Sequence, residues 1–450
     1  MRALVLIFSL LVSACATAQV APINAPLGGL HTEVEGRAPV GDDLIVLALS
    51  GGGARAASFH LGVLQALRDT PGRDGRPLSE HIALITSVSG GSVLAAYYGL
   101  HGDPGLDAFD AAYLGREWRV RGPSSPVGIA GALRGGMNGP NQLRDWLAAN
   151  VYGDATIGDM GVGPRVILNA TDLYNSTPFA FTQFFFDGIC SDVRQVRVAD
   201  AVAASMAVPV AFRPVVIESY GARCAGPPAW VPRVLADRSA GENVRQTARA
   251  FQNYRGDTVA AQRFVHLVDG GVADNLGMLS LQVLRADGLP SPLTAAEAMQ
   301  ARRVLFLVVN AEYIRPRTFQ QEGTDAIGAY EMMYAPVDVA TEVAKRASVD
   351  VWRAQLPAYE TALREWRCTE TREALALSRT EGNVRPRLHC NDLHLSMDVI
   401  TFRDMEPAEY EALYDTETQV SLPRETVDAL TRAGRGVVGR NAALREFRRN

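Results

Sequence analysis

A serine in a glycine-rich turn is the first residue whose type and surroundings suit chemistry. Ser89 belongs to the stretch 87–92, with sequence SVSGGS, which follows the apolar stretch 82–86. A sharp turn from a buried strand into a helix exposes such a serine above the sheet edge, provided that small residues flank it two positions away, here Ser87 and Gly91. The same residues are typical of an ordinary helix cap and turn, so this motif alone leaves both interpretations open.

Three consecutive glycines supply the backbone groups that an acyl-transfer reaction needs. Gly51, Gly52 and Gly53 follow the apolar stretch 44–49 and precede a helical pattern. Because they carry no side chains, their N–H groups can approach a substrate oxygen, and the start of the helix adds its positive end. Arg55 adds a full charge nearby. We therefore expect an oxyanion hole at these glycines, which Arg55 supports electrostatically.

The glycine loop also fits a loose dinucleotide-binding fingerprint, Gly51-x-Gly53-x-x-Ala56, which is a weak signal by itself. The sequence contains no phosphate-binding loop of the Gly-x-x-x-x-Gly-Lys-Ser/Thr type. Its 44 Lys and Arg against 49 Asp and Glu give a formal net charge of -5, which offers no basic surface to nucleic acid. We expect neither a bound cofactor nor a nucleic-acid partner.

A carboxylate is the best-placed candidate for the general base. The apolar stretch 264–268 runs into an Asp-Gly-Gly turn that begins with Asp269. Asp269 is therefore expected at the carboxyl edge of the sheet, as is Ser89. Among the histidines, His60 lies in a helical pattern, and His266 is expected to point from the opposite face of its strand. An aspartate before glycines is more commonly a turn-forming or capping residue, and this alternative stays open.

The elements that carry these residues alternate between strands and helices. Buried strands without polar alternation are expected at 44–49, 82–88, 165–170, 210–217, 264–268 and 304–310. Strands of this kind, interleaved with helical patterns, indicate an α/β fold with a mostly parallel sheet covered on both faces. Ligands bind such sheets at the carboxyl ends of the strands, where the glycine loop and the Ser89 turn would lie.

Taken together, these residues resemble the patatin-like phospholipase family of lipid acyl hydrolases. The likeness lies in three motifs in order, GGGAR at 51–55, SVSGG at 87–91 and DGG at 269–271, with further similarity at 169–172 and 204–209. It covers about residues 44–310. It implies a three-layer α/β/α fold, a catalytic dyad of Ser89 and Asp269, an oxyanion hole at the glycine loop, and an acyl-ester lipid as substrate.

Two positions qualify this resemblance. The family usually has glycine where this chain has Ser87, so we expect a slightly more strained turn there. His60 matches a family histidine that is not catalytic, so we expect it to pack in the interior.

A carboxylate that acts directly on serine must have its pKa raised, which partial burial beside an apolar acyl pocket can do. Five phenylalanines are apolar enough to line such a pocket, although sheet core is their commoner role. They are Phe179, Phe181, Phe184, Phe185 and Phe186.

The N-terminus resembles an export signal. Residues 1–14 combine a charged start with an apolar stretch that falls short of the roughly 20 residues needed to span a bilayer. The sequence VSAC at 12–15 resembles the bacterial lipobox, so we expect a lipidated Cys15; an ordinary signal cleaved near Ala18 is the alternative. Ala16, rather than Asp, after the cysteine favours the outer membrane of the cell envelope, facing the periplasm.

The remaining four cysteines are an even number in an oxidising compartment, which permits two disulfides in three connectivities. We expect Cys190 to pair with Cys224 and Cys368 with Cys390, because each pair closes a local loop. The neighbouring His389 and Cys390 raise a zinc site as an alternative, but the sequence has no metal-binding spacing to support one.

The chain is thus expected to contain a signal peptide at 1–14, a lipidated tether at 15–41, a catalytic domain at 42–310 and a mainly helical extension at 311–450. The polar stretch 220–263 either covers the site or is a surface excursion. The leading hypothesis is a membrane-anchored serine acyl hydrolase of the lipase, phospholipase A or lysophospholipase type, which cleaves lipid acyl esters. The alternative is a weakly active or inactive envelope protein that keeps the fold to bind lipid or a partner.

Overall fold

The computed structural model describes residues 21–28, 32–118, 136, 138, 141–256, 258, 260–311, 329–381 and 390–449, with the backbone alone in 329–338 and 371–381. The predicted signal peptide, Cys15 and the beginning of the tether lie outside the described residues. Within the described part of the chain, no helix combines the length and the apolar character that crossing a membrane requires.

The strands form one mixed sheet with the order β5-β6-β3-β2-β1-β7-β8, and β4 pairs with β3. Their bounds are β1 Asp43–Leu49, β2 Ile82–Val88, β3 Arg165–Asp172, β4 Thr177–Ala180, β5 Val215–Glu218, β6 Phe264–Asp269, β7 Arg303–Asn310 and β8 His394–Thr401. The helices are α2 Gly53–Asp69, α3 Gly90–Phe109, α5 Gln142–Leu147, α6 Gln183–Gly188, α7 Val198–Ser205, α8 Trp230–Ala236, α9 Glu242–Arg255, α10 Gly271–Asp274, α11 Met278–Leu284, α12 Ala295–Gln300, α13 Ala329–Glu381, α14 Pro407–Leu413, α15 Arg424–Arg440 and α16 Ala442–Arg449.

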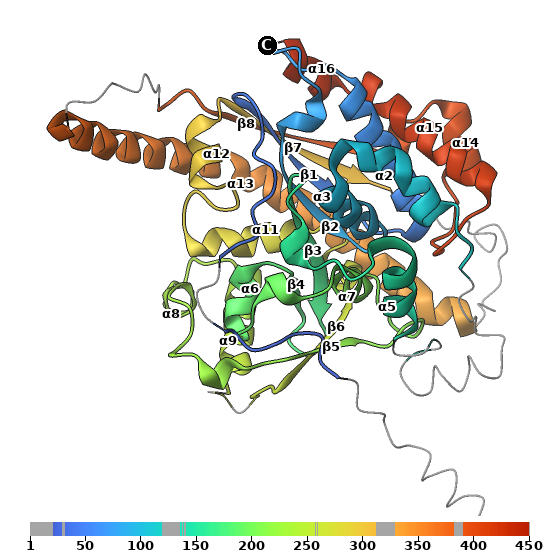
Figure 1. Ribbon diagram of the computed structural model, residues 1–450, viewed down its shortest axis with the longest axis horizontal. Helices are drawn as coiled ribbons and strands as arrows, with labels where there is room; N and C mark the ends of the chain where they lie inside the picture. The colour runs from blue at the N-terminus through green and yellow to red at the C-terminus, as the bar shows by residue number, and fades with distance from the viewer. Residues whose placement is uncertain are drawn as a thin grey trace, which may run out of the picture.

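Helices cover both faces of this sheet, as Figure 1 shows. The helices α3 and α7 pack on one face, with α2 beside α3 and α15 beside α2; α10, α11 and α13 lie on the other face. Every side chain of β1 and β2 is buried, which is what central strands require when both faces are covered. The predicted three-layer α/β/α fold with a mostly parallel sheet is therefore confirmed.

The direction of β6 differs from the simple parallel arrangement. β8, β7, β1, β2 and β3 run parallel to their neighbours, whereas β6 is antiparallel to β3, as is the short β4. A buried apolar strand looks the same in sequence whichever way it runs, so the pattern at 264–268 did not reveal this. The predicted strand at 210–217 begins only at Val215, because Val210 lies in a turn with φ 71°.

The C-terminal extension is less uniformly helical than expected. His394–Thr401 forms β8, which pairs in parallel with β7 along its whole length and extends the sheet. The helix α15 lies against α2, and glycine permits the close contact: a Cβ at Gly62 would lie 2.0 Å from the carbonyl oxygen of Thr431. The extension is thus packed on the strands and helices that carry the glycine loop.

The stretch after β5 forms α8 and α9, which pack against each other and against α6. All five candidate phenylalanines are buried, and Phe184 and Phe185 pack against Phe251 of α9, while Phe184 also stacks on Trp230 of α8. These rings therefore belong to the core rather than to an open acyl pocket.

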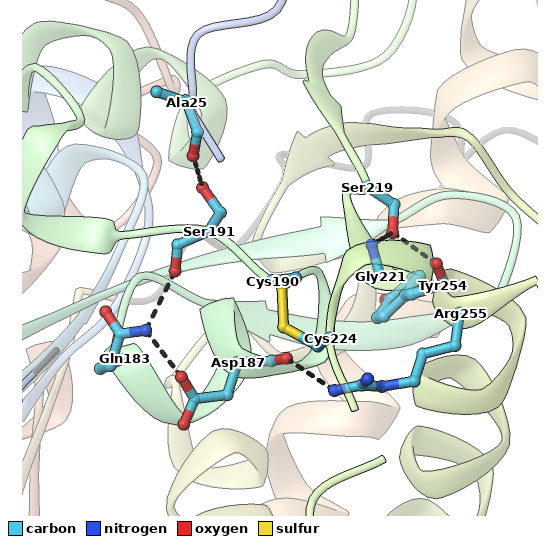
Figure 2. The surroundings of a disulfide bond; sticks show 10 residues. All are labelled: Ala25, Gln183, Asp187, Cys190, Ser191, Ser219, Gly221, Cys224, Tyr254 and Arg255. Carbon is cyan, nitrogen blue, oxygen red and sulfur yellow. Dashed lines mark hydrogen bonds between the residues drawn. A yellow bond between two sulfur atoms is a disulfide. The ribbon is translucent and has the colours of Figure 1, made fainter. Parts of the chain in front are cut away.

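The structure joins Cys190 to Cys224 and Cys368 to Cys390, the same two pairs that the sequence analysis expects. Figure 2 shows the first bond between the end of α6 and the turn that follows β5. Next to it, the Ser191 hydroxyl donates a hydrogen bond to the carbonyl oxygen of Ala25, which attaches the N-terminal segment at this corner. The disulfide therefore fixes a corner where three chain segments meet.

Replacing both Cys190 and Cys224 with serine should lower the free energy of unfolding by about 4 kcal/mol, because the bond closes a loop of 34 residues. Urea unfolding of the oxidised protein, followed by tryptophan fluorescence, measures the difference. An unfolding free energy equal to that of the wild type would show that the bond does not constrain this corner.

Candidate active site

Ser89 occupies a strained turn directly after β2. Its backbone has φ 50° and ψ -119°, a conformation that costs a residue with a Cβ about 1–3 kcal/mol. The next residue must be glycine, since a Cβ at Gly90 would lie 2.1 Å from the carbonyl oxygen of Gly53. Ser87 is an ordinary residue of β2, so the strain lies at Ser89 rather than at Ser87. Such strain at a strand-to-helix turn is typical of a nucleophile.

Asp269 reaches the same place from the opposite direction. Val88 pairs with Asn169 of β3, and the next residue of β3, Ala170, pairs with Asp269 at the end of β6. Ser89 and Asp269 therefore flank β3 in one row across the sheet, with main chains about 10 Å apart at the usual strand spacing. The Ser89 side chain interacts with the carboxylate of Asp269, so the two side chains meet beside β3. The antiparallel direction of β6 thus still delivers the carboxylate to the serine.

The carboxylate of Asp269 is set up as a base that works near neutral pH. Only 6% of the residue is exposed, and burial raises its pKa from 3.8 to about 6. The N–H of Gly271 donates to Oδ1 at 2.7 Å and the Ser89 side chain lies close enough to interact, and both oppose part of this rise in pKa. Oδ2 accepts no hydrogen bond of ordinary geometry within the described residues, so it is available to receive a proton.

The glycine loop lies beside Ser89 and offers two backbone donors. The N–H of Gly51 donates to the carbonyl oxygen of Asn275 at 3.1 Å, and the N–H of Ala54 donates to that of Gln419 at 2.7 Å. Among the hydrogen bonds of the described residues, none uses the N–H of Gly52 or Gly53. Gly51 leaves space next to Ser89, because a Cβ at this position would lie 3.1 Å from the Cβ of Ser89. The candidate oxyanion donors of the loop are therefore the N–H groups of Gly52 and Gly53.

Arg55 ties the loop to the C-terminal extension, which differs from the purely electrostatic role expected. It is buried, and its guanidinium donates to the carbonyl oxygen of Thr416 at 2.7 Å, to Thr418 Oγ1 at 2.9 Å and to the carbonyl oxygen of Ala311 at 3.3 Å. The same group lies under the loop, since a Cβ at Gly52 would be 2.8 Å from Nη2. Arg55 thus holds the glycine loop between the end of β7 and the extension.

Neither candidate histidine joins Ser89. His60 is fully buried in α2, and burial lowers its pKa to about 3, so it is neutral and packs in the interior as expected. His266 pairs with Val216 in the sheet, and its ring meets the edge of Tyr174. Among the described residues, no group of three or more His, Cys, Asp or Glu side chains is arranged to hold a metal ion.

Three residues of the site were not assigned a role from the sequence. Asn275 follows the Asp-Gly-Gly turn and accepts from Gly51, Gln419 comes from the extension and accepts from Ala54, and Ser205 accepts from the N–H of Ser89 at 2.8 Å. Only Ser205 had a signal, because it lies in the stretch 204–209 that resembles the family. The hydrogen bonds that Asn275 and Gln419 accept here use their backbone carbonyl groups, which leave no trace in residue type.

Comparison with known proteins shows the family to which the chain is similar. The family model for patatin-like phospholipase matches residues 47–281, just over half of the 450 residues, and includes both Ser89 and Asp269. A search of curated proteins found no match.

Among solved structures, the human GIVD cytosolic phospholipase A2 is similar at 12% identity and a TM-score of 0.39, covering 90% of this chain and 62% of that chain. VipD from Legionella pneumophila is similar at 13% identity and a TM-score of 0.33, covering 96% of this chain and 72% of that chain. The chain thus spans less than two thirds of the length of the human protein. On the extent of the family match, this chain belongs to the patatin-like phospholipase family.

Proposed function

We propose that the protein is a serine acyl hydrolase in which Ser89 is the nucleophile, Asp269 is the general base, and the N–H groups of Gly52 and Gly53 form the oxyanion hole. One observation carries this proposal: a serine in a strained turn lies beside a buried carboxylate whose pKa is raised to about 6. Serine needs such a base because its own pKa is far above neutral.

The reaction proceeds in two halves. Asp269 takes the proton of Ser89 while Oγ attacks the acyl carbonyl carbon, and the resulting oxyanion accepts hydrogen bonds from Gly52 and Gly53. The tetrahedral intermediate then expels the alcohol, which takes the proton from Asp269, and an acyl-enzyme remains on Ser89. Asp269 next deprotonates a water molecule that attacks the acyl-enzyme, and the same proton returns to Ser89 as the fatty acid leaves.

Membership of the family supports lipid hydrolysis in general terms. We further propose an acyl ester of a phospholipid or lysophospholipid as substrate. For the location, the export signal at 1–14 and the lipobox at 12–15 support a protein lipidated at Cys15 and attached to the envelope membrane, where such lipids are found. The tether 15–41 would then separate the anchor from the sheet.

Ser89→Ala and Asp269→Asn should each lower kcat for a short-chain aryl ester by about 10³-fold or more, because the first removes the nucleophile and the second the base. Initial rates with p-nitrophenyl butyrate, measured on folded protein, give the comparison. Asp274→Asn is a matched control: its carboxylate is also buried, but it accepts from the N–H groups of Leu276 and Leu279. Wild-type rates in either of the first two variants would exclude the dyad.

Asp269→Asn should also be more stable than the wild type at pH 8, by up to about 3 kcal/mol. The pKa of Asp269 is higher in the folded than in the unfolded protein, so the folded state holds its proton more tightly. Wild-type stability from this residue is therefore complete below about pH 4 and is lost as the pH rises through about 6.

Urea unfolding of both proteins at pH 4 and pH 8 tests this expectation. The difference should fall below about 1 kcal/mol at pH 4, where the carboxyl group is neutral in the folded state and about half neutral in the unfolded state. A variant that is less stable than the wild type at pH 8 would contradict a raised pKa for Asp269.

A further inference from the structure

The end of α7 and the turn that follows it contact both proposed catalytic residues. The hydroxyl oxygen of Ser205 accepts a hydrogen bond from the N–H of Ser89 at 2.8 Å. The carbonyl oxygen of Ser205 accepts from the N–H of Gly270 at 3.2 Å, and that of Ala207 accepts from the N–H of Asp269 at 2.9 Å. One segment of three residues, Ser205–Ala207, thus holds the backbone on both sides of the site.

The position of this segment at a helix end explains why its carbonyl groups are available. The last carbonyl groups of an α-helix have no partner within the helix. Ser205 is the last residue of α7, and Ala207 follows two residues later. The N–H groups of Asp269 and Gly270 donate hydrogen bonds to these carbonyl oxygens. The bonds join the end of α7 to the turn that contains Asp269.

The hydroxyl of Ser205 has no spare hydrogen-bonding capacity. It is fully buried, and it donates its one hydrogen to the carbonyl oxygen of Asn169 at 2.6 Å. The bond of 2.9 Å to the hydroxyl of Ser92 must therefore be donated by Ser92. Together with the N–H of Ser89, this fills both lone pairs of the Ser205 oxygen. A hydroxyl with these three partners has only one orientation.

The Ser205 hydroxyl contacts the backbone at Ser89, the residue whose conformation is strained. The positive φ of Ser89 is unfavourable, so neighbouring contacts must keep the residue in place. Its N–H is buried, and without Ser205 it would lose its hydrogen-bond partner. We propose that Ser205 is a positioning residue that holds Ser89 in its strained conformation, and that the segment Ser205–Ala207 sets the separation between Ser89 and Asp269.

This inference rests on the proposed function, since it concerns how the same two residues are aligned. It also has a consequence for the oxyanion hole. Because the N–H of Ser89 donates to Ser205, it does not point into the hole, and the donors proposed for the oxyanion remain those of Gly52 and Gly53. Ser205 touches no reacting atom, so its removal should slow the chemical step without weakening the binding of substrate.

The test compares Ser205→Ala with Ser92→Ala in the full chain. Ser92 is a matched control because it is equally buried and belongs to the same chain of hydroxyl groups, yet its side chain makes no hydrogen bond to Ser89. We measure kcat and KM with p-nitrophenyl butyrate, and the unfolding free energy in urea.

Ser205→Ala should lower kcat by about 10- to 100-fold, as expected for the loss of one buried hydrogen bond at the nucleophile, with KM within twofold of the wild type. Ser92→Ala should lower kcat by less than about threefold on the same reasoning, even where it loses similar stability. Equal losses of kcat in the two variants, or a Ser205→Ala enzyme with more than half of the wild-type kcat, would overturn the proposal.

A Ser205→Cys variant covers the case in which Ser205→Ala does not fold. It keeps the side chain in place but accepts hydrogen bonds weakly, so kcat should lie at least about threefold below that of the wild type; a wild-type kcat in this variant also overturns the proposal. Failure of the proposed function is recognised separately, because Ser89→Ala would then retain activity whatever Ser205 does.

Discussion

The site depends on the close approach of backbone turns that only glycine permits. The glycine loop and the Ser89 turn lie so near each other that a Cβ at Gly90 would meet the carbonyl oxygen of Gly53 at 2.1 Å. The Asp-Gly-Gly turn lies as close to β3, where a Cβ at Gly270 would meet the carbonyl oxygen of Asn169 at 2.4 Å. These close contacts gather the proposed nucleophile, the proposed base and the proposed amide donors from distant parts of the chain.

Two parts of the chain outside the three turns hold them together. The extension contributes the carbonyl oxygen of Gln419 to the start of α2 and, through Thr416 and Thr418, two acceptors to Arg55. The end of α7 performs the equivalent task for Ser89 and Asp269. Holding a strained serine and a buried carboxylate lowers the stability of the folded state, which is the usual consequence of building a reactive site. The extensive core on both faces of the sheet offsets it.

Local patterns in the sequence predicted Ser89, Asp269 and the glycine loop, because each follows an apolar strand and is marked by glycine. The antiparallel direction of β6 was not predictable in this way. β8 was missed for another reason: Leu395, Met397 and Val399 alternate with polar residues, as in a half-buried strand, whereas the strands expected from the sequence were only those without such alternation. The contacts of Arg55 with Thr416 and of Ser205 with Ser89 join residues 361 and 116 positions apart, so no local pattern encodes them. The domain boundaries and the lipidated Cys15 remain predictions.

The pH dependence of covalent labelling tests the central claim most directly. A fluorophosphonate probe reacts with a serine only as fast as its base removes the proton, and mass spectrometry of the digested protein locates the adduct. We expect the adduct on Ser89 and a second-order rate constant that rises with pH through a single pKa near 6, the value that burial gives Asp269. An adduct on another residue, or a labelling rate on Ser89 that does not change between pH 5 and pH 8, would contradict the pairing of Ser89 with Asp269.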